Sequence, residues 1–194
     1  MTAIGSVCVY CGSSHRVAPE FRQGAQAVGG QLAHDGITLV YGGGRVGLMG
    51  DVADGALAAG GRVVGFIPEH LYDLEAAHTD LTELHVVDTM HTRKMRMFEQ
   101  SDGFLVLPGG LGTLDELMEV LTWKQLGLHR KPVVLFDMAG YWQPLLTLLD
   151  AQIAAGFARP AHRNLFEVVD TYADALAAMR RAPPPLSTPI TKWA

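Results

Sequence analysis

A short apolar segment, a glycine-rich turn and an amphipathic helix follow one another in the middle of the chain. Residues 103–107 (GFLVL) have the length and the β-forming side chains of one buried strand in a parallel sheet. Pro108 ends this strand, and the glycines that follow leave little side chain in the turn. Thr113 is predicted to open a helix, whose inner face carries Leu114, Leu117, Met118 and Leu121. This unit restricts the chain to an α/β fold with the turn at the carboxyl end of a strand.

The glycine turn is predicted to bind an anion. The backbone N–H groups of Gly109, Gly110 and Gly112, together with the positive end of the helix dipole, face the crevice at the sheet edge. Thr113 adds a hydroxyl donor. A phosphate group is therefore the expected ligand.

Glu116 follows Thr113 at a T-x-x-E spacing that has two interpretations. It is the pattern of a capping box, in which the glutamate only closes its own helix. A carboxylate beside a phosphate site is otherwise repelled by it, and is useful only if a positive charge forms during the reaction. Cleavage of an N-glycosidic bond forms such a charge, because the ribose passes through an oxocarbenium-like state.

A basic cluster precedes the glycine turn by about one helix and one strand. It consists of Arg93, Lys94 and Arg96. A lone cluster of this kind is usually a solvated helix face. Its position before an anion-binding turn favours a clamp on phosphate or ribose oxygens, for which arginine is well suited.

Several motifs together resemble the LOG family, the cytokinin riboside 5'-monophosphate phosphoribohydrolases long labelled as lysine decarboxylases. The most specific are M-H-x-R-K at 90–94, P-G-G-x-G-T-x-x-E at 108–116 and T-W at 122–123. The resemblance covers nearly the whole chain, including CVYCGSS at 8–14, YGGGRVGLMG at 41–50 and KPVVLFD at 131–137. It implies a Rossmann-like doubly wound parallel sheet with helices on both faces.

The resemblance also implies site residues. Arg93 and Glu116 match the catalytic pair of the family. The matching substrate contacts are Glu75, Lys94, Gly43, Gly44 and Thr122. The implied reaction is hydrolysis of the N-glycosidic bond of adenosine 5'-monophosphate, plain or N6-modified, to a free base and ribose 5-phosphate. The alternative is a non-catalytic nucleotide or molybdenum-cofactor carrier of the same fold, which would bind without turnover.

Neither a cofactor nor a metal is expected. A pyridoxal-phosphate decarboxylase needs a lysine for its Schiff base, and none of the few lysines lies in a recognisable cofactor context. No cluster of His, Asp and Cys has the spacing of metal ligands. Cys8 and Cys11 face opposite sides of a strand and are predicted to be small buried thiols.

Two further turns follow the first two predicted strands. Residues 11–15 (CGSSH) follow the strand at 6–10, where Ser13 offers its hydroxyl either to a ligand or to the local backbone. The strand at 38–41 leads into a G-x-G-x-x-G turn of the dinucleotide-binding type. Because that motif normally follows the first strand of its unit, a mononucleotide is favoured over NAD.

Residues 1–182 are predicted to form one catalytic domain, and 183–194 an extended tail. The irregular loop at 68–83 is a candidate lid. The remaining expected elements are strands at 62–67, 84–87, 132–136 and 166–169, and helices at 19–34, 48–59, 141–155 and 172–181.

The net charge and the hydropathy of the chain limit the classes of molecule that it is expected to bind. A net charge of −5 argues against nucleic acids and anionic membranes. With neither a signal-type segment nor an apolar run of roughly 20 residues, the protein is expected in the cytoplasm. A homodimer, with a higher oligomer as an alternative, is implied by the resemblance. The candidate interface residues on the two helices flanking the turn are Met95, Met97, Phe98, Leu117, Met118, Leu121 and Trp123.

Overall fold

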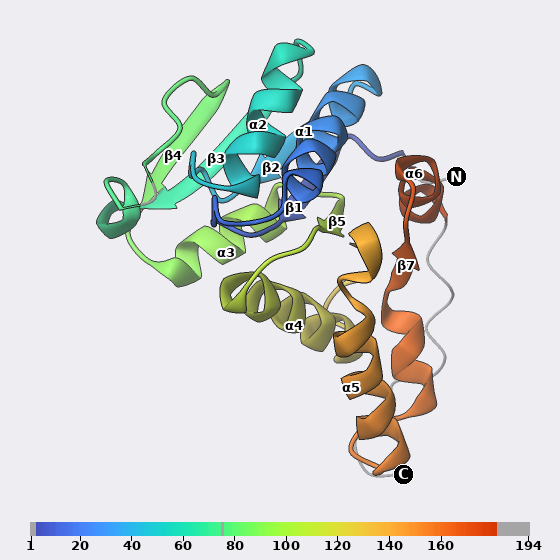
Figure 1. The fold of residues 1–194 in the computed structure, drawn as a ribbon. Coiled ribbons are helices and arrows are strands. Elements are labelled where there is room, and N and C mark those ends of the chain that lie inside the picture. Colours follow the sequence, from blue (N-terminus) through green and yellow to red (C-terminus); the bar gives the residue numbers. More distant parts are fainter. Residues whose placement is uncertain (1–2, 75, 182–194) are drawn as a thin grey trace.

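The computed structural model describes residues 3–74 and 76–181. Glu75 and the predicted tail at 183–194 lie outside the described residues. Within the described part of the chain, strands and helices alternate along the sequence, and the strands form one parallel sheet (Figure 1).

The strand order is β4-β3-β2-β1-β5-β6-β7, with all neighbours parallel. The strands are β1 (Ser6–Tyr10), β2 (Thr38–Tyr41), β3 (Val63–Pro68), β4 (Glu83–Val87), β5 (Gly103–Val106), β6 (Val133–Phe136) and β7 (Glu167–Val169). The helices are α1 (Pro19–His34), α2 (Leu48–Ala58), α3 (Met90–Glu99), α4 (Leu111–Gln125), α5 (Gln143–Ala154) and α6 (Tyr172–Arg180). Short 3-10 turns are η1 (Glu69–Leu71), η2 (Met138–Gly140) and η3 (Pro160–Leu165).

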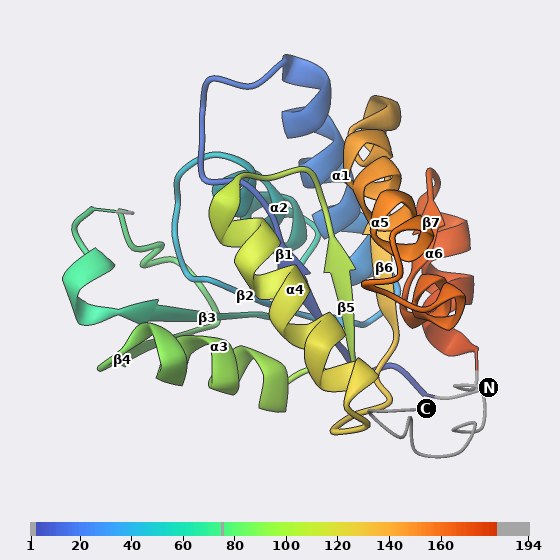
Figure 2. The ribbon, with the colours of Figure 1, turned by 90° about the horizontal axis from the view of Figure 1, so that it is seen from below.

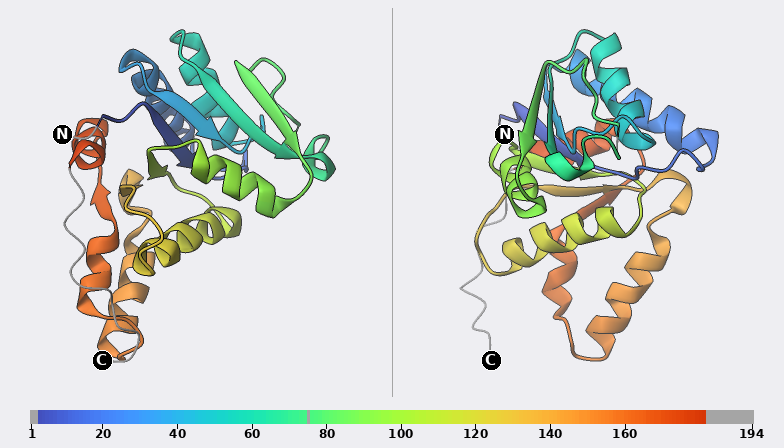
Figure 3. Two further views of the ribbon diagram at one scale, coloured as in Figure 1. Left: turned by 180° about the vertical axis from the view of Figure 1, so that it is seen from behind. Right: turned by 90° about the vertical axis from the view of Figure 1, so that its left-hand side faces the viewer.

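Helices cover both faces of the sheet, which confirms the predicted doubly wound fold (Figures 2 and 3). One core cluster combines side chains of α1, α2 and α6, and the other combines side chains of α3, α4 and α5. Alternate residues of β1 enter opposite clusters, and Cys8 and the following Cys11 belong to different ones. Both are buried free thiols, as predicted.

The strand order reverses beside β1, because β2 pairs with one of its edges and β5 with the other. The turns that leave β1 and β5 therefore diverge to opposite faces of the sheet at its carboxyl edge. The two turns are joined there by a hydrogen bond of 3.0 Å, which the Gly12 N–H donates to the Pro108 carbonyl. Ligands of open α/β sheets bind at this kind of position.

Candidate active site

Helix α4 begins two residues earlier than the sequence predicted. Its N-cap is Gly110, and the Leu114 N–H donates the first helical hydrogen bond to the Gly110 carbonyl at 3.1 Å. Thr113 therefore lies inside the first turn and cannot act as the N-cap, and no side chain caps this helix. The capping-box interpretation of Thr113 and Glu116 is wrong, because that motif needs the threonine at the N-cap.

The start of α4 has the properties of an anion site. The N–H groups of its first turn, from Gly110 to Thr113, have no partner inside the helix, and the turn contains no acidic residue. A Cβ added to Gly110 or Gly112 would meet no atom within 4 Å. The space beside these two glycines is therefore open, at the positive end of the helix dipole.

Gly109 and Thr113 shape the turn itself. Thr113 is almost fully buried, and its Oγ1 packs so closely on Gly109 that a Cβ there would lie 2.0 Å away. The same Cβ would lie 2.8 Å from the Gly12 nitrogen. Gly109 is therefore required by packing, whereas Gly110 and Gly112 are not.

Glu116 is half-buried on α4, about one helical turn beyond Gly112 and Thr113 and on the same helix face. Its negative charge affects the pKa of two thiols in and next to β1. Burial is the main cause that raises the pKa of the Cys8 and Cys11 thiols, and the Glu116 carboxylate is the next. The Glu116 carboxylate therefore interacts electrostatically with the two thiols at the carboxyl end of β1 and just after it.

Arg93 reaches the same place from α3. Its side chain is buried, and its Nε and Nη2 donate to the carbonyls of Phe66 and Gly42 at 3.1 and 2.7 Å. A Cβ on Gly42 would lie 2.2 Å from Nη2, so the glycine makes room for the guanidinium. Burial, Glu116 and Asp51 raise the pKa of the Cys11 thiol, and the positive charge of Arg93 works in the opposite direction. The solvated-face interpretation is wrong for Arg93, which is buried. Arg93 and Glu116 both act on the pKa of Cys11, the residue directly after β1.

Lys94 points to α4. Its Nζ lies 3.1 Å from an oxygen of Asp115 and 3.2 Å from one of Glu119. Burial works against the charge of this amine, but the two carboxylates raise its pKa above the ordinary value. Lys94 therefore joins α3 to α4 next to Glu116. Thr122 is exposed and donates to the Met118 carbonyl at 2.7 Å, about 14 Å along the helix from Thr113, so the described chain does not place it at the turn.

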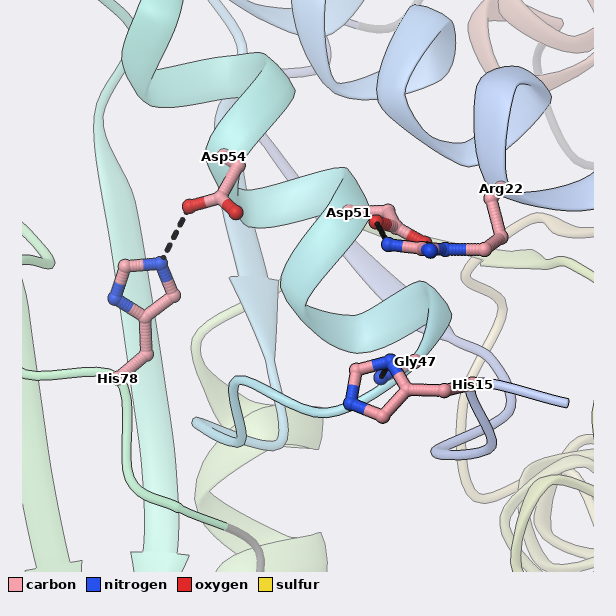
Figure 4. A network of polar contacts seen from close by, with 6 residues as sticks. All are labelled: His15, Arg22, Gly47, Asp51, Asp54 and His78. Atoms are coloured by element: carbon pink, nitrogen blue, oxygen red, sulfur yellow. Dashed lines mark hydrogen bonds and ion pairs between the residues drawn. The ribbon is translucent and has the colours of Figure 1, made fainter. Parts of the chain in front are cut away.

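The G-x-G-x-x-G turn differs from the turn at α4, because the start of α2 is already occupied (Figure 4). The Gly47 N–H points to Nδ1 of His15 at 3.4 Å, and Asp51 in the first turn of α2 forms an ion pair with Arg22 at 2.8 Å. Ser13 is exposed, and its carbonyl carbon would lie 2.5 Å from a Cβ on Gly47. The groups of this turn contact other parts of the protein, so the turn is a poorer anion site than the start of α4.

The loop after β3 lies against the same turn. The His78 N–H donates to the Gly43 carbonyl at 2.9 Å, and Gly44 forms an isolated antiparallel bridge with Ala77. The buried His78 ring lies 2.9 Å from Asp54 on α2 (Figure 4). The segment around His78 is therefore anchored on α2.

No motif in the sequence singles out Tyr141. Its hydroxyl donates to the Gly109 carbonyl at 2.6 Å. It precedes α5, beyond β6, and only the neighbouring positions of β5 and β6 in the sheet bring it to the turn. The signal available in the sequence is its position at the predicted start of the helix that follows the strand at 132–136.

The fold and the site define an α/β protein of the Rossmann-like class, with an open helix N-terminus, a carboxylate and a buried arginine at the strand reversal. A family model described as "Possible lysine decarboxylase" matches residues 49–179, and the chain belongs to this family.

Relatives give the family a more specific description. The chain is 48% identical over 176 residues to a protein of Rhodococcoides fascians named cytokinin riboside 5'-monophosphate phosphoribohydrolase, covering 90% of this chain and 89% of the relative. It is 45% identical over 159 residues to a protein of the same name from Arabidopsis thaliana, covering 82% and 73%. The resemblance drawn from the motifs is thereby confirmed.

Solved structures confirm the fold. The molybdenum cofactor carrier protein of Chlamydomonas reinhardtii superposes with a TM-score of 0.68 over 91% of this chain and 96% of its own, at 24% identity. The molybdenum cofactor binding protein of Rippkaea orientalis gives 0.66 at 21% identity, with 91% and 96% covered. Likeness at these identities describes the architecture alone. None of the described helices has the length and apolar character needed to cross a bilayer.

Proposed function

We propose that this chain hydrolyses the N-glycosidic bond of adenosine 5'-monophosphate, with or without a substituent on N6, to the free base and ribose 5-phosphate. The names and high identities of the relatives support this activity over a carrier role. The observation that carries the proposal is the half-buried Glu116 carboxylate one helical turn from the open amides of α4. A pure anion-binding site would gain nothing from that charge.

In the proposed reaction the 5'-phosphate binds the N–H groups of Gly109, Gly110, Gly112 and Thr113, with the Thr113 hydroxyl beside them. The bond from C1' to the base nitrogen breaks and leaves its electron pair on the base. The Glu116 carboxylate stabilises the positive charge that develops on the ribose and directs the attacking water. The water oxygen bonds to C1', and its proton balances the charge of the departing base.

Arg93 is proposed to orient the ribose or its phosphate. Its bonds to the carbonyls of Gly42 and Phe66 support this role, because they fix the guanidinium at the end of the strands. The remaining substrate contacts are still predictions and involve Ser13, Gly43, Gly44, Glu75, Lys94 and Thr122.

The proposal predicts that the phosphate contributes to the rate as well as to binding. Binding energy from the remote anion holds the sugar in its reactive position, so its removal lowers kcat. Purified protein should therefore release base from AMP or from isopentenyladenosine monophosphate much faster than from adenosine. Chromatographic detection of free base and ribose 5-phosphate tests this. Equal rates for AMP and adenosine would contradict the placement of the phosphate, and AMP binding without turnover would leave only a carrier.

Assembly and location complete the proposal. We infer a homodimer that uses the exposed parts of α3 and α4. Met95 on α3 is 42% exposed and supports such an interface, whereas Met97, Leu117 and Leu121 are buried in the protomer core. We also infer a cytoplasmic protein, consistent with two buried free cysteines. Light scattering and cell fractionation test these two points.

A further inference from the structure

The contact of Tyr141 with the glycine turn assigns this residue a role in the site. We propose that Tyr141 is a positioning residue that orients the Gly109–Gly110 peptide, so that the Gly110 N–H points into the phosphate site. The inference rests on the proposed function, since it takes the anion at α4 to be the phosphate of the substrate.

The geometry of the peptide bond carries the first step. In a planar trans peptide the C=O and the N–H of the same unit point in opposite directions. The Tyr141 hydroxyl holds the Gly109 carbonyl at 2.6 Å, so it also fixes the opposite direction of the Gly110 N–H. The preceding unit is fixed in the same way, because the Pro108 carbonyl accepts from Gly12 at 3.0 Å and thereby orients the Gly109 N–H.

Glycine residues make this constraint necessary. Gly109 and Gly110 lack the side chains that would restrict their backbone, and a Cβ on Gly110 would meet no atom within 4 Å. The Gly110 carbonyl accepts from the Leu114 N–H and Gly109 packs against Thr113, but no side chain of Gly110 restricts the peptide unit between the two glycines. The hydrogen bond from Tyr141 supplies an orientation that the local sequence does not.

The ring of Tyr141, which is 40% exposed, packs on two aromatic neighbours. Its ring makes edge contacts with Phe21 on α1 and with the buried Trp142, at centroid distances of 5.9 and 5.0 Å. The backbone N–H of Trp142 donates to the side chain of Asp137, the residue directly after β6, at 2.8 Å.

The backbone before Tyr141 is also constrained. Ala139 and Gly140 have φ values of 52° and 73°, and a left-handed conformation is costly for the alanine. Strain of this kind persists where the surrounding structure holds it, and the turn it makes directs Tyr141 toward the β5–α4 turn.

Tyr141→Phe tests the proposal, because it removes the hydroxyl and keeps the ring contacts. The matched control is Tyr172→Phe, which removes a hydroxyl at the start of α6 that donates to Asp35, at the end of α1, at 2.7 Å. Calorimetry measures binding of inorganic phosphate, AMP and adenosine to each protein, and the hydrolysis assay gives kcat and KM.

We expect Tyr141→Phe to weaken binding of phosphate and AMP by about tenfold, the effect of one well-placed hydrogen bond. Binding of adenosine should stay within twofold, and Tyr172→Phe should bind all three like the wild type. A general structural role would instead weaken adenosine and AMP equally, and that result overturns the proposal. So does AMP binding that stays within twofold in Tyr141→Phe.

The two proposals fail separately. If the wild-type chain cleaves AMP and Tyr141→Phe binds and cleaves it equally well, the role of Tyr141 is refuted and the hydrolase stands. If the wild type binds AMP without cleaving it, the hydrolase is refuted, and the binding comparison still decides the role of Tyr141. A wild type that binds neither phosphate nor AMP refutes both.

Discussion

Gly112 offers a test in which stability and binding should change in opposite directions. It lies inside the first turn of α4, and a Cβ added there would meet no atom within 4 Å. Alanine costs about 0.5–1 kcal/mol less than glycine in a helix. Gly112→Ala should therefore raise the free energy of unfolding by about that amount, which corresponds to a rise of about 1–4 °C in Tm.

Nucleotide binding should suffer from the same substitution. If the space beside Gly112 receives the phosphate, the added methyl group keeps it away from an open N–H. Loss of a hydrogen bond to a charged group costs about 1.5–3 kcal/mol, or roughly 10- to 100-fold in affinity. The variant should be more stable than the wild type and bind AMP at least about tenfold more weakly.

Urea unfolding and calorimetric titration with AMP measure the two quantities. Gly30→Ala is the matched control, because Gly30 lies within α1 and its added Cβ would make an ordinary contact of 3.7 Å with the Gly55 carbonyl. That control should gain stability and keep its affinity. Normal AMP binding by Gly112→Ala would refute the anion site at the start of α4.

Three other substitutions follow from the structure. Glu116→Gln should lower kcat at least about 100-fold in the hydrolysis assay and change the free energy of unfolding by less than about 1 kcal/mol. The control Glu99→Gln, at the end of α3, should stay active, and near-normal turnover by Glu116→Gln would remove Glu116 from the mechanism. Gly42→Ala should expel the Arg93 guanidinium, because the added Cβ would lie 2.2 Å from Nη2. The free energy of unfolding measured in urea should fall by about 2–3 kcal/mol. A stable, active variant would contradict the importance of that packing. Burial lowers the pKa of Lys124 to about 8, so the folded chain bears the cost of a buried charge below pH 8 and loses that cost as the pH rises toward 10.5. Lys124→Met should thus be about 1–2 kcal/mol more stable at pH 7, with a smaller gain at pH 10, and a gain independent of pH would exclude this cause.

Local patterns predicted most of the architecture. The runs at 6–10 and 38–41 have the bounds of β1 and β2, and the glycine turn follows the carboxyl end of β5, as the run at 103–107 predicts. These patterns succeed because buried parallel strands are short, apolar and separated by helices. The motif resemblance added the family, which the relatives confirm.

Predictions failed where a contact joins distant segments or where a residue has a poor propensity for its element. The helix start was missed because Gly110 and Gly112 are weak helix formers, and the threonine of a T-x-x-E pattern was a better local candidate for the cap. Arg93 was ambiguous because its partners, Gly42 and Phe66, are backbone carbonyls that carry no mark in the sequence. The hydrogen bond from Tyr141 likewise depends on the strand order.

The central position of β1 has a consequence for the growing polypeptide. Val7 pairs with Leu39 on one side and with Gly103 on the other, so the first strand to be made cannot complete its pairing until β5 has left the ribosome. Contacts this distant along the chain are slow to form. Competence to bind a nucleotide should accordingly arise late in biosynthesis, and a nucleotide added during refolding should favour the finished sheet over its partly assembled precursors.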